Sequence, residues 1–432
     1  MAQKTKQWAA IIVMIALFAM IAFVTNLCSP MATIIKAQGE ISNVLAQIGN
    51  YGNFGAYLIM GLPAGMCIKK YGYKKTALIG LVVGIVGILL QMCSGLLNAQ
   101  ENLGLVFAVY LAGALIAGAC MCILNTVVNP MLNLLGGGGA SGNQLIQIGG
   151  VFNSAAAVAV YIIMGALIGE ASKAKIADAM PALAIALAIF VVAFIVIFFT
   201  KIDEPEQAED TEGQMELVKG ALSYRHFVYG ILAICFYGAV EVGPPTYIVQ
   251  YLTTATDAAT PGLGMAASYC GTLGAIYFLM MLAGRLLGGI VGGAIAPKTM
   301  IGSVSAVSLV LLLIGIFLPD TMTIHFPGVD WVTMSLVWGD IPVGIFLFLL
   351  VGLCASVMWG GIFNLAVEGL GKYTAIASGL FMCMVCGFAI MVGIQGLVAD
   401  ITGSFLLSFL VPAACAAYIL WFALIGSKPA QK

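Results

Sequence analysis

Long apolar segments constrain the fold of this chain more than any other feature. A membrane-spanning helix needs about 20 mostly apolar residues, because its backbone amides must find partners inside the hydrocarbon layer. Only 8% of the residues are charged, against roughly 25% in soluble domains, so a water-exposed globule lacks the polar surface it needs. We count twelve windows, which begin near residues 8, 43, 76, 104, 144, 180, 226, 265, 299, 342, 374 and 404. We therefore expect an all-α membrane protein with twelve transmembrane helices.

An acidic segment divides these windows into two groups of six. Seven of the eighteen carboxylates lie between Asp203 and Glu216, which is the midpoint of the 432-residue chain. We predict a six-helix bundle over residues 1–200, an acidic linker over 201–224 and a second six-helix bundle over 225–432. The first window has no small-residue cleavage site, so we interpret it as a span and not as a signal peptide.

The two halves resemble each other. An ungapped comparison at an offset of 219 residues aligns 51–65 with 270–284, with identities at Gly52/Gly271, Gly55/Gly274, Ala56/Ala275, Ala64/Ala283 and Gly65/Gly284. A second match, found by counting back from Gly136 and from Gly371, places Asn129 opposite Asn364. Small residues at this spacing also allow close helix packing, which is an alternative explanation of part of the match. Two related bundles with a site between them are typical of transporters that alternate access by rocking.

The distribution of lysine and arginine predicts the orientation. With twelve spans, thirteen basic residues lie on the side of the two termini and three, Lys36, Lys173 and Lys175, lie on the other. Basic loops stay in the cytoplasm, so we expect a multi-pass inner-membrane protein with both termini cytoplasmic. The net charge of −1 and the absence of a basic tract or zinc spacing give no reason to expect nucleic acid or a metal site. We interpret the cysteines, Cys383 and Cys386 included, as small apolar residues of the spans.

Glu241 is the acidic residue that lies deepest within a predicted span. It is about fifteen residues into span seven, where a central charge costs roughly 2.5–3.5 kcal/mol on insertion scales. The Pro244-Pro245 pair removes two backbone donors and predicts a break in the helix beside it. Burial favours the protonated form of a carboxylic acid, which is what a proton- or cation-coupled carrier requires. The alternative is a carboxylate bonded to a neighbouring donor such as a tyrosine, with a role in helix packing alone.

Amide side chains form a second group of polar residues within the spans. Amides and hydroxyls around a cavity, with an aromatic ring for the C–H face of a sugar, suit a polyhydroxyl solute. Each amide taken alone is equally explained by an interhelical hydrogen bond. The predicted substrate-binding residues are Asn26, Asn125, Asn129, Gln147, Asn153, Trp359 and Asn364.

The loop between spans two and three is basic. Its sequence from Gly65 to Lys75 resembles the gating loop of the major facilitator superfamily, although Lys69 stands where that superfamily usually has an acid. We predict gating roles for Lys69 and Lys70. Arg285 follows Gly284 near the cytoplasmic end of span eight, at the position equivalent to this loop, and is the third predicted gating residue. The alternative for the lysines is a role in topology alone.

Several motifs together resemble one family. They are Leu124–Pro130, Gly136–Gln147, Phe152–Ser154, Ile362–Gly371, Ala399–Gly403 and Ser408–Pro412. They are similar to the fucose–proton symporter family, a sugar-transporting branch of the major facilitator superfamily that includes glucose/galactose carriers. The resemblance implies two pseudo-symmetric bundles, the major facilitator fold, and a hexose substrate. Ser29 and Asn125 stand where the fucose member has carboxylates, which implies a hexose other than fucose. Glu241 matches an acid of the glucose-type members.

These observations predict a secondary transporter that imports a hexose such as glucose, galactose or mannose and works as a monomer in the lipid bilayer. Glu241 would carry coupling to H⁺ or Na⁺, with no cofactor and no catalytic residue. The alternatives are an uncoupled sugar facilitator and a drug or metabolite exporter of the same superfamily. A sensor built on a transporter scaffold and a membrane enzyme fit less well, since no nucleophile–base pair lies at membrane depth. The hexose, the coupling ion, the stoichiometry, the resting conformation and the role of residues 320–340 stay open.

Overall fold

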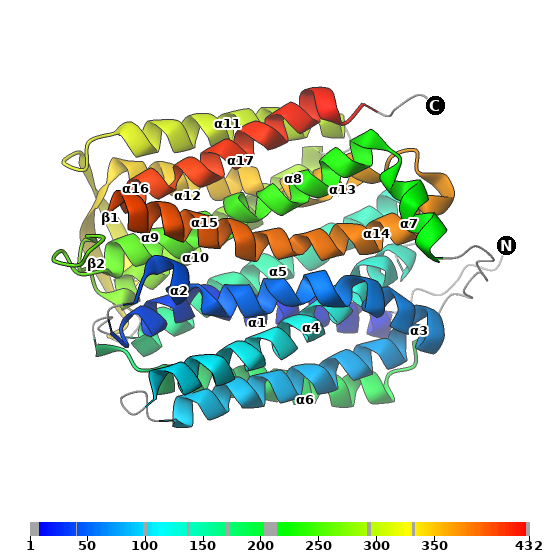
Figure 1. Ribbon diagram of the computed structural model, residues 1–432, viewed down its shortest axis with the longest axis horizontal. Helices are drawn as coiled ribbons and strands as arrows, with labels where there is room; N and C mark the ends of the chain where they lie inside the picture. Colours follow the sequence, from blue (N-terminus) through cyan, green and yellow to red (C-terminus); the bar gives the residue numbers. More distant parts are fainter. Residues whose placement is uncertain are drawn as a thin grey trace.

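The chain folds into helices that run side by side along one direction (Figure 1). The computed structural model describes residues 8–39, 41–97, 102–135, 139–168, 173–202, 214–291, 295–330 and 333–428. The first half contains α1 (Trp8–Lys36), α2 (Asn43–Ala46), α3 (Ile48–Leu96), α4 (Leu103–Leu135), α5 (Gly139–Ile168), the 3₁₀ turn η2 (Ile176–Ala179) and α6 (Met180–Phe199).

The second half has more and shorter helices. They are α7 (Gln214–Leu222), α8 (Arg225–Glu241), α9 (Gly243–Thr253), α10 (Ala267–Val291), α11 (Pro297–Phe317), α12 (Val343–Ala355), α13 (Met358–Val367), α14 (Thr374–Cys383), α15 (Gly387–Thr402), α16 (Phe405–Ser408) and α17 (Leu410–Trp421). Short turns η3 (Gly371–Tyr373), η4 (Met384–Cys386) and η5 (Phe422–Gly426) join or extend them.

The helices account for the predicted spans. Among the described residues, ten helical segments are long and apolar enough to cross a membrane, and the bent pair α12 and α13 makes an eleventh. The span predicted near residue 43 is the first part of α3, a 49-residue helix whose backbone turns at Gly72, with φ 80° and ψ 174°. A positive φ of this kind is accessible to glycine and disfavoured for other residues. The prediction of an all-α membrane fold is confirmed, and the arrangement is consistent with twelve spans.

The two halves form two groups of helices that meet along their length. Figure 1 shows the first half, in blue and cyan, below the second half, in green to red. Helix α5 packs against α10, α3 packs against α14 and α15, and α1 packs against α9. The linker predicted over 201–224 lies partly outside the described residues, and α7 occupies its second part.

The two ends of the molecule differ. Both chain termini lie at one end, which we name the termini end, and β1, β2, α2 and α16 lie at the other, the hairpin end (Figure 1). Strands β1 (Thr323–Asp330) and β2 (Ser335–Pro342) form an antiparallel hairpin in the segment 320–340, whose role the sequence left open. Trp331, which follows β1 in the sequence, is outside the described residues.

Helix α10 holds the hairpin in place. The hydroxyl of Tyr269 donates to the backbone oxygen of Phe326 at 3.0 Å, and the hydroxyl of Thr272 donates to that of Val329 at 2.9 Å. Gly328 and Gly339 lie against the Tyr269 ring, where a Cβ on Gly339 would come within 2.8 Å of the ring. The segment is therefore a folded cap on α10 and not an extended connector.

Candidate functional site

Three spans of the second half are interrupted at the same depth. Helix α8 ends at Glu241 and α9 begins at Gly243, so the break predicted from Pro244-Pro245 is confirmed. Helices α12 and α13 meet at an angle of 42° beside Ser356, and η4 separates α14 from α15. Backbone without regular helical hydrogen bonds is tolerated inside a membrane where protein or a cavity surrounds it. The breaks therefore mark the depth at which a site is expected.

A cavity of about 110 Å³ lies at this depth between the two halves. Its walls come from α1, α3, α4 and α5 of the first half and from α8, α10, α13, η4 and α15 of the second. The lining residues are Phe18, Ile21, Ala22, Thr25, Asn26, Phe54, Tyr57, Asn125, Asn129, Asn153, Glu241, Arg285, Trp359, Val385 and Phe388. Because both halves contribute, a movement of one half against the other changes the shape of the cavity.

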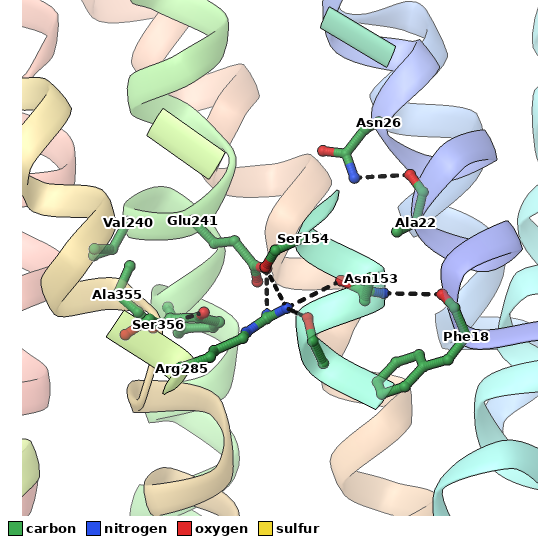
Figure 2. A network of polar contacts seen from close by, with 12 residues as sticks. Phe18, Ala22, Asn26, Asn153, Ser154, Val240, Glu241, Arg285, Ala355 and Ser356 are labelled. Atoms are coloured by element: carbon green, nitrogen blue, oxygen red, sulfur yellow. Dashed lines mark hydrogen bonds and ion pairs between the residues drawn. The ribbon is translucent and has the colours of Figure 1, made fainter. Parts of the chain in front are cut away.

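The charged part of the wall is the pair Glu241 and Arg285. The closest approach is 3.9 Å between Arg285 Nη2 and Glu241 Oε1, and the two side chains are 11% and 18% exposed, respectively. Arg285 also reaches α5 in the other half, where its Nη1 donates to Gly150 O at 2.6 Å and Ser154 Oγ at 2.7 Å (Figure 2). Arg285 thus links a buried carboxylate of one half to the backbone of the other.

Asparagines form the polar wall, and their amide groups are oriented by local bonds. Asn26 Nδ2 donates to Ala22 O at 2.8 Å, and Asn153 Nδ2 donates to Phe18 O at 3.1 Å (Figure 2). These bonds use amide hydrogens and aim the side-chain oxygen of Asn26 away from its own helix. An oxygen so placed can accept a hydrogen bond from a donor in the cavity.

The two asparagines of α4 are oriented in the same way. Asn125 Nδ2 donates to the Tyr57 hydroxyl at 2.8 Å, and Asn129 Nδ2 donates to Asn125 O at 3.0 Å. The four-residue spacing places both on one face of α4, as the sequence predicted. In the part of the chain that the structure describes, the side-chain oxygens of Asn26 and Asn129 accept no hydrogen bond from the protein.

Aromatic rings form the opposite wall. Trp359 packs edge-on against Phe381 and Phe388, with ring centroids 5.8 and 6.2 Å apart and interplanar angles of 90° and 82°. Phe388 also contacts Phe54 of the first half, at 5.1 Å between centroids. Edge-to-face contacts of this kind fix a ring in place. The indole is therefore held as a rigid surface beside the amides.

Most of the predicted site residues lie together. Asn26, Asn125, Asn129, Asn153, Trp359 and Glu241 all line the cavity. Asn364 does not: its side chain is exposed on α13, outside the cavity wall, so its alignment with Asn129 does not give it an equivalent place. The side chain of Gln147 is outside the described part of the structure.

The three residues predicted to gate lie in different places. Arg285 lies near the end of the candidate span Ala267–Gly288, as predicted, and its side chain also lines the cavity. Lys70 is exposed, with its Nζ 5.0 Å from the centre of the Tyr71 ring, and the side chain of Lys69 is outside the described part. In the same loop, Lys74 Nζ donates to Phe198 O and Thr200 O at the end of α6.

Sequence reasoning missed the remaining partners. Phe54, Phe388 and Phe18 are phenylalanines among 22 in the chain, and nothing in their spacing separates them from lipid-facing rings. Ser154 had a signal, because it ends the Phe152–Ser154 motif and accepts from Arg285. Tyr57 lies one helical turn beyond Asn53 on α3, so the two side chains share a face of the helix. The sequence did not show that its hydroxyl bonds to Asn125.

Comparisons with known proteins agree with this architecture. The family model of the Major Facilitator Superfamily matches residues 9–394. A glucose/galactose transporter of Brucella abortus is 29% identical over 419 residues, covering 95% of this chain and 92% of that protein. An L-fucose-proton symporter of Escherichia coli is 23% identical over 399 residues, covering 87% of this chain and 83% of that one.

Solved structures show the same fold. The transporter FucP in the outward conformation has a TM-score of 0.68 at 21% identity, covering 98% of this chain and 99% of that chain. A D-xylose-proton symporter has a TM-score of 0.69 at 13% identity, covering 98% and 99%. The fold and the site between its halves define a membrane transporter and not an enzyme. The chain belongs to the major facilitator superfamily.

Proposed function

We propose that this protein imports a hexose, namely glucose, galactose or mannose, across the inner membrane by alternating access, coupled to H⁺ or Na⁺ through Glu241. The observation that carries the proposal is the cavity wall, which combines four asparagine side chains, the indole of Trp359 and the ion pair of Glu241 and Arg285. A hexose offers hydroxyl donors on its edge and C–H groups on its faces. The relatives named glucose/galactose transporter support the same substrate class.

The size of the cavity favours a small solute. At about 110 Å³ it is well below the roughly 300–1,000 Å³ of pockets that hold drug-sized ligands. Four asparagines in the wall also offer hydrogen-bonding groups that suit a polyhydroxyl solute. Both features support a monosaccharide over the exporter alternative.

The position of Arg285 suggests how an ion would affect transport. An ionised Glu241 balances the charge of Arg285, whereas a protonated Glu241 leaves Arg285 to its acceptors on α5. A sodium ion would compete with Arg285 for the carboxylate in the same way. Because Arg285 bonds across the two halves, the state of Glu241 changes the strength of an inter-half contact. Coupling then follows, because the halves must separate there for alternating access.

The basic residues support an orientation for this cycle. We propose that the termini end faces the cytoplasm and the hairpin end faces the periplasm, because the lysine and arginine bias places the termini inside. A monomer suffices for this mechanism, since one chain supplies both walls of the cavity.

Uptake into proteoliposomes tests the proposal. Purified protein reconstituted in lipid is expected to take up labelled glucose, galactose or mannose, and an inward H⁺ or Na⁺ gradient is expected to raise the internal concentration above the external one. Equal concentrations at the end point, unaffected by either gradient, would support the uncoupled facilitator. No hexose uptake together with export of a drug-like dye would contradict the substrate class.

The amide wall gives a graded prediction. Asn129→Ala removes a side-chain hydrogen bond to the sugar, which is worth about 0.5–1.5 kcal/mol, so KM for the hexose should rise roughly 2- to 12-fold. Asn364→Ala is the matched control, because that asparagine is exposed and outside the cavity wall. The measurement is the initial rate of uptake against hexose concentration. An equal rise in KM for both variants would show that the sugar does not bind specifically to the cavity wall that contains Asn129.

A further inference from the structure

The two halves are fastened together by polar side chains at the hairpin end. We use the name hairpin-end seam for Ser29, Lys36, Asn43, Thr246, Thr254, Thr260 and Asp400. Across it, Thr246 Oγ1 donates to Ser29 Oγ at 2.8 Å, and Asn43 Nδ2 donates to Thr260 Oγ1 at 3.2 Å. Lys36 Nζ lies between the halves, donating to Asn43 Oδ1 and, at 3.4 Å, to Thr254 Oγ1. The seam therefore holds the two halves in contact at this end.

Asp400 makes the strongest contacts of the seam. One carboxylate oxygen accepts from Asn43 N at 2.9 Å and from Asn43 Nδ2 at 2.6 Å, and the other accepts from Val44 N at 3.1 Å. These bonds join α15 of the second half to α2 of the first, and Asn43 is 1% exposed. Hydrogen bonds to an ionised acceptor are roughly twice as strong as neutral ones.

Helix α2 depends on this carboxylate. The first backbone N–H groups of a helix have no partner within it, and a negative charge there is favourable. Ser42 satisfies Leu45 N from within the same half, whereas Asn43 N and Val44 N are satisfied by Asp400 from the other half. A helix of four residues is not stable alone. Opening the seam therefore removes what holds α2 in its helical form.

Two polar side chains next to the seam, Thr33 and Gln250, lack hydrogen-bond partners in the described part of the chain. Thr33 and Gln250 each lie four residues beyond the bonded pair Ser29 and Thr246, on the facing helices α1 and α9. Both are buried, at 6% and 1% exposure, and in the described part of the chain Thr33 Oγ1 and the Gln250 amide have no hydrogen-bond partner. Unpartnered buried polar groups oppose closure, because water would satisfy them in an open state. The closed state of the seam therefore depends mainly on the hydrogen bonds that Asp400 accepts.

We propose that Asp400 is the latch of the hairpin-end seam: its carboxylate holds α2 and sets the balance between the closed state seen here and a state open at the hairpin end. Each transport cycle then includes release and recapture of α2 by Asp400. The latch proposal rests on the proposed function, alternating access between the halves. That the latch acts on the periplasmic side rests on the proposed orientation of the protein.

Distances between the halves test the latch without any sugar. Nitroxide labels on non-natural ketone residues at Ala177 and Thr256, which are exposed at the hairpin end of the first and second half, leave the eleven native cysteines unlabelled. In Asp400→Asn, pulsed electron resonance in nanodiscs is expected to show a longer-distance population, with the open-to-closed ratio raised about tenfold. Asn43→Ala keeps the two backbone bonds to Asp400 but removes the side-chain bonds of Asn43 with Asp400, Thr260 and Lys36, so it should shift the ratio in the same direction.

A matched carboxylate provides the control. Asp340 lies on the hairpin, 68% exposed, and pairs with His325 of the same half, so Asp340→Asn should leave the distances unchanged. Unchanged distances in both Asp400→Asn and Asn43→Ala, with melting temperatures like the wild type, would overturn the latch. The distance measurement uses no solute, so its result does not depend on whether the protein carries a hexose. Equally, evidence against the latch would not affect the test of hexose uptake.

Discussion

Glu241→Gln is expected to abolish concentrative hexose uptake while retaining counterflow exchange. Glutamine keeps the size of the side chain and its position at the end of α8, so the cavity can still bind and exchange sugar. It neither ionises nor binds a proton, so an ion gradient no longer drives the cycle. The ratio of internal to external hexose should fall to about one, because without coupling the carrier only equilibrates its solute. The measurement is labelled hexose accumulation in proteoliposomes with an imposed H⁺ or Na⁺ gradient.

Two comparisons make this result specific. Glu368→Gln changes an exposed carboxylate at the end of α13, outside the cavity wall, and should accumulate hexose like the wild type. Counterflow in Glu241→Gln should stay within about threefold of wild type, as expected when a hydrogen-bonding group of similar shape is kept. Gradient-driven accumulation that persists in Glu241→Gln would remove the coupling role from this residue.

Arg285→Met is expected to destabilise the protein strongly. It leaves Glu241 buried without its cation and removes the bonds to Gly150 and Ser154. Breaking a buried ion pair costs about 3–5 kcal/mol, and we expect about 3 kcal/mol here because both side chains border a cavity. The measurement is thermal unfolding in nanodiscs, where the melting temperature should fall by several degrees.

The double variant separates the ion pair from the other contacts of Arg285. Glu241→Gln combined with Arg285→Met removes both charges, so it should be more stable than Arg285→Met alone. An interaction energy of about 1–2 kcal/mol is expected, as for residues that contact each other. Additive losses of stability would mean that the carboxylate and the guanidinium do not compensate each other in the membrane.

Much of the fold could be predicted from the sequence because the membrane restricts the choices. Apolar windows of sufficient length predict spanning helices regardless of their partners, and the acidic segment ending at Glu216 separated the halves. The break beside Glu241 followed from Pro244-Pro245, which cannot donate backbone hydrogen bonds. The breaks beside Ser356 and at η4 have no such signal, since neither contains a proline.

The sequence could predict those site residues whose side chains are costly to place within a membrane. Asn26, Asn125, Asn129, Asn153 and Glu241 stand out because polar groups within a span require partners. The pairing of helices from different halves was not available from the sequence. The sequence therefore did not show that Arg285 contacts α5, and the alignment of halves did not show that Asn364 lies outside the wall.

The seam at the hairpin end was missed for a related reason. Asp400 belongs to the motif Ala399–Gly403, and Asn43 lies at the start of a predicted span. Their contact joins positions 357 residues apart, and no local pattern indicates it. Long-range pairing of polar side chains is set by the docking of whole helices, which spacing along one helix does not encode.

Equilibrium binding to the purified protein tests the central claim most directly. Calorimetric titration with glucose, galactose and mannose, with and without sodium and at two pH values, is predicted to show saturable binding of at least one hexose. That binding should weaken roughly 2- to 12-fold in Asn129→Ala and stay unchanged in Asn364→Ala. Absence of hexose binding under all these conditions, or equal binding in the two variants, would contradict a sugar site in the cavity between the halves.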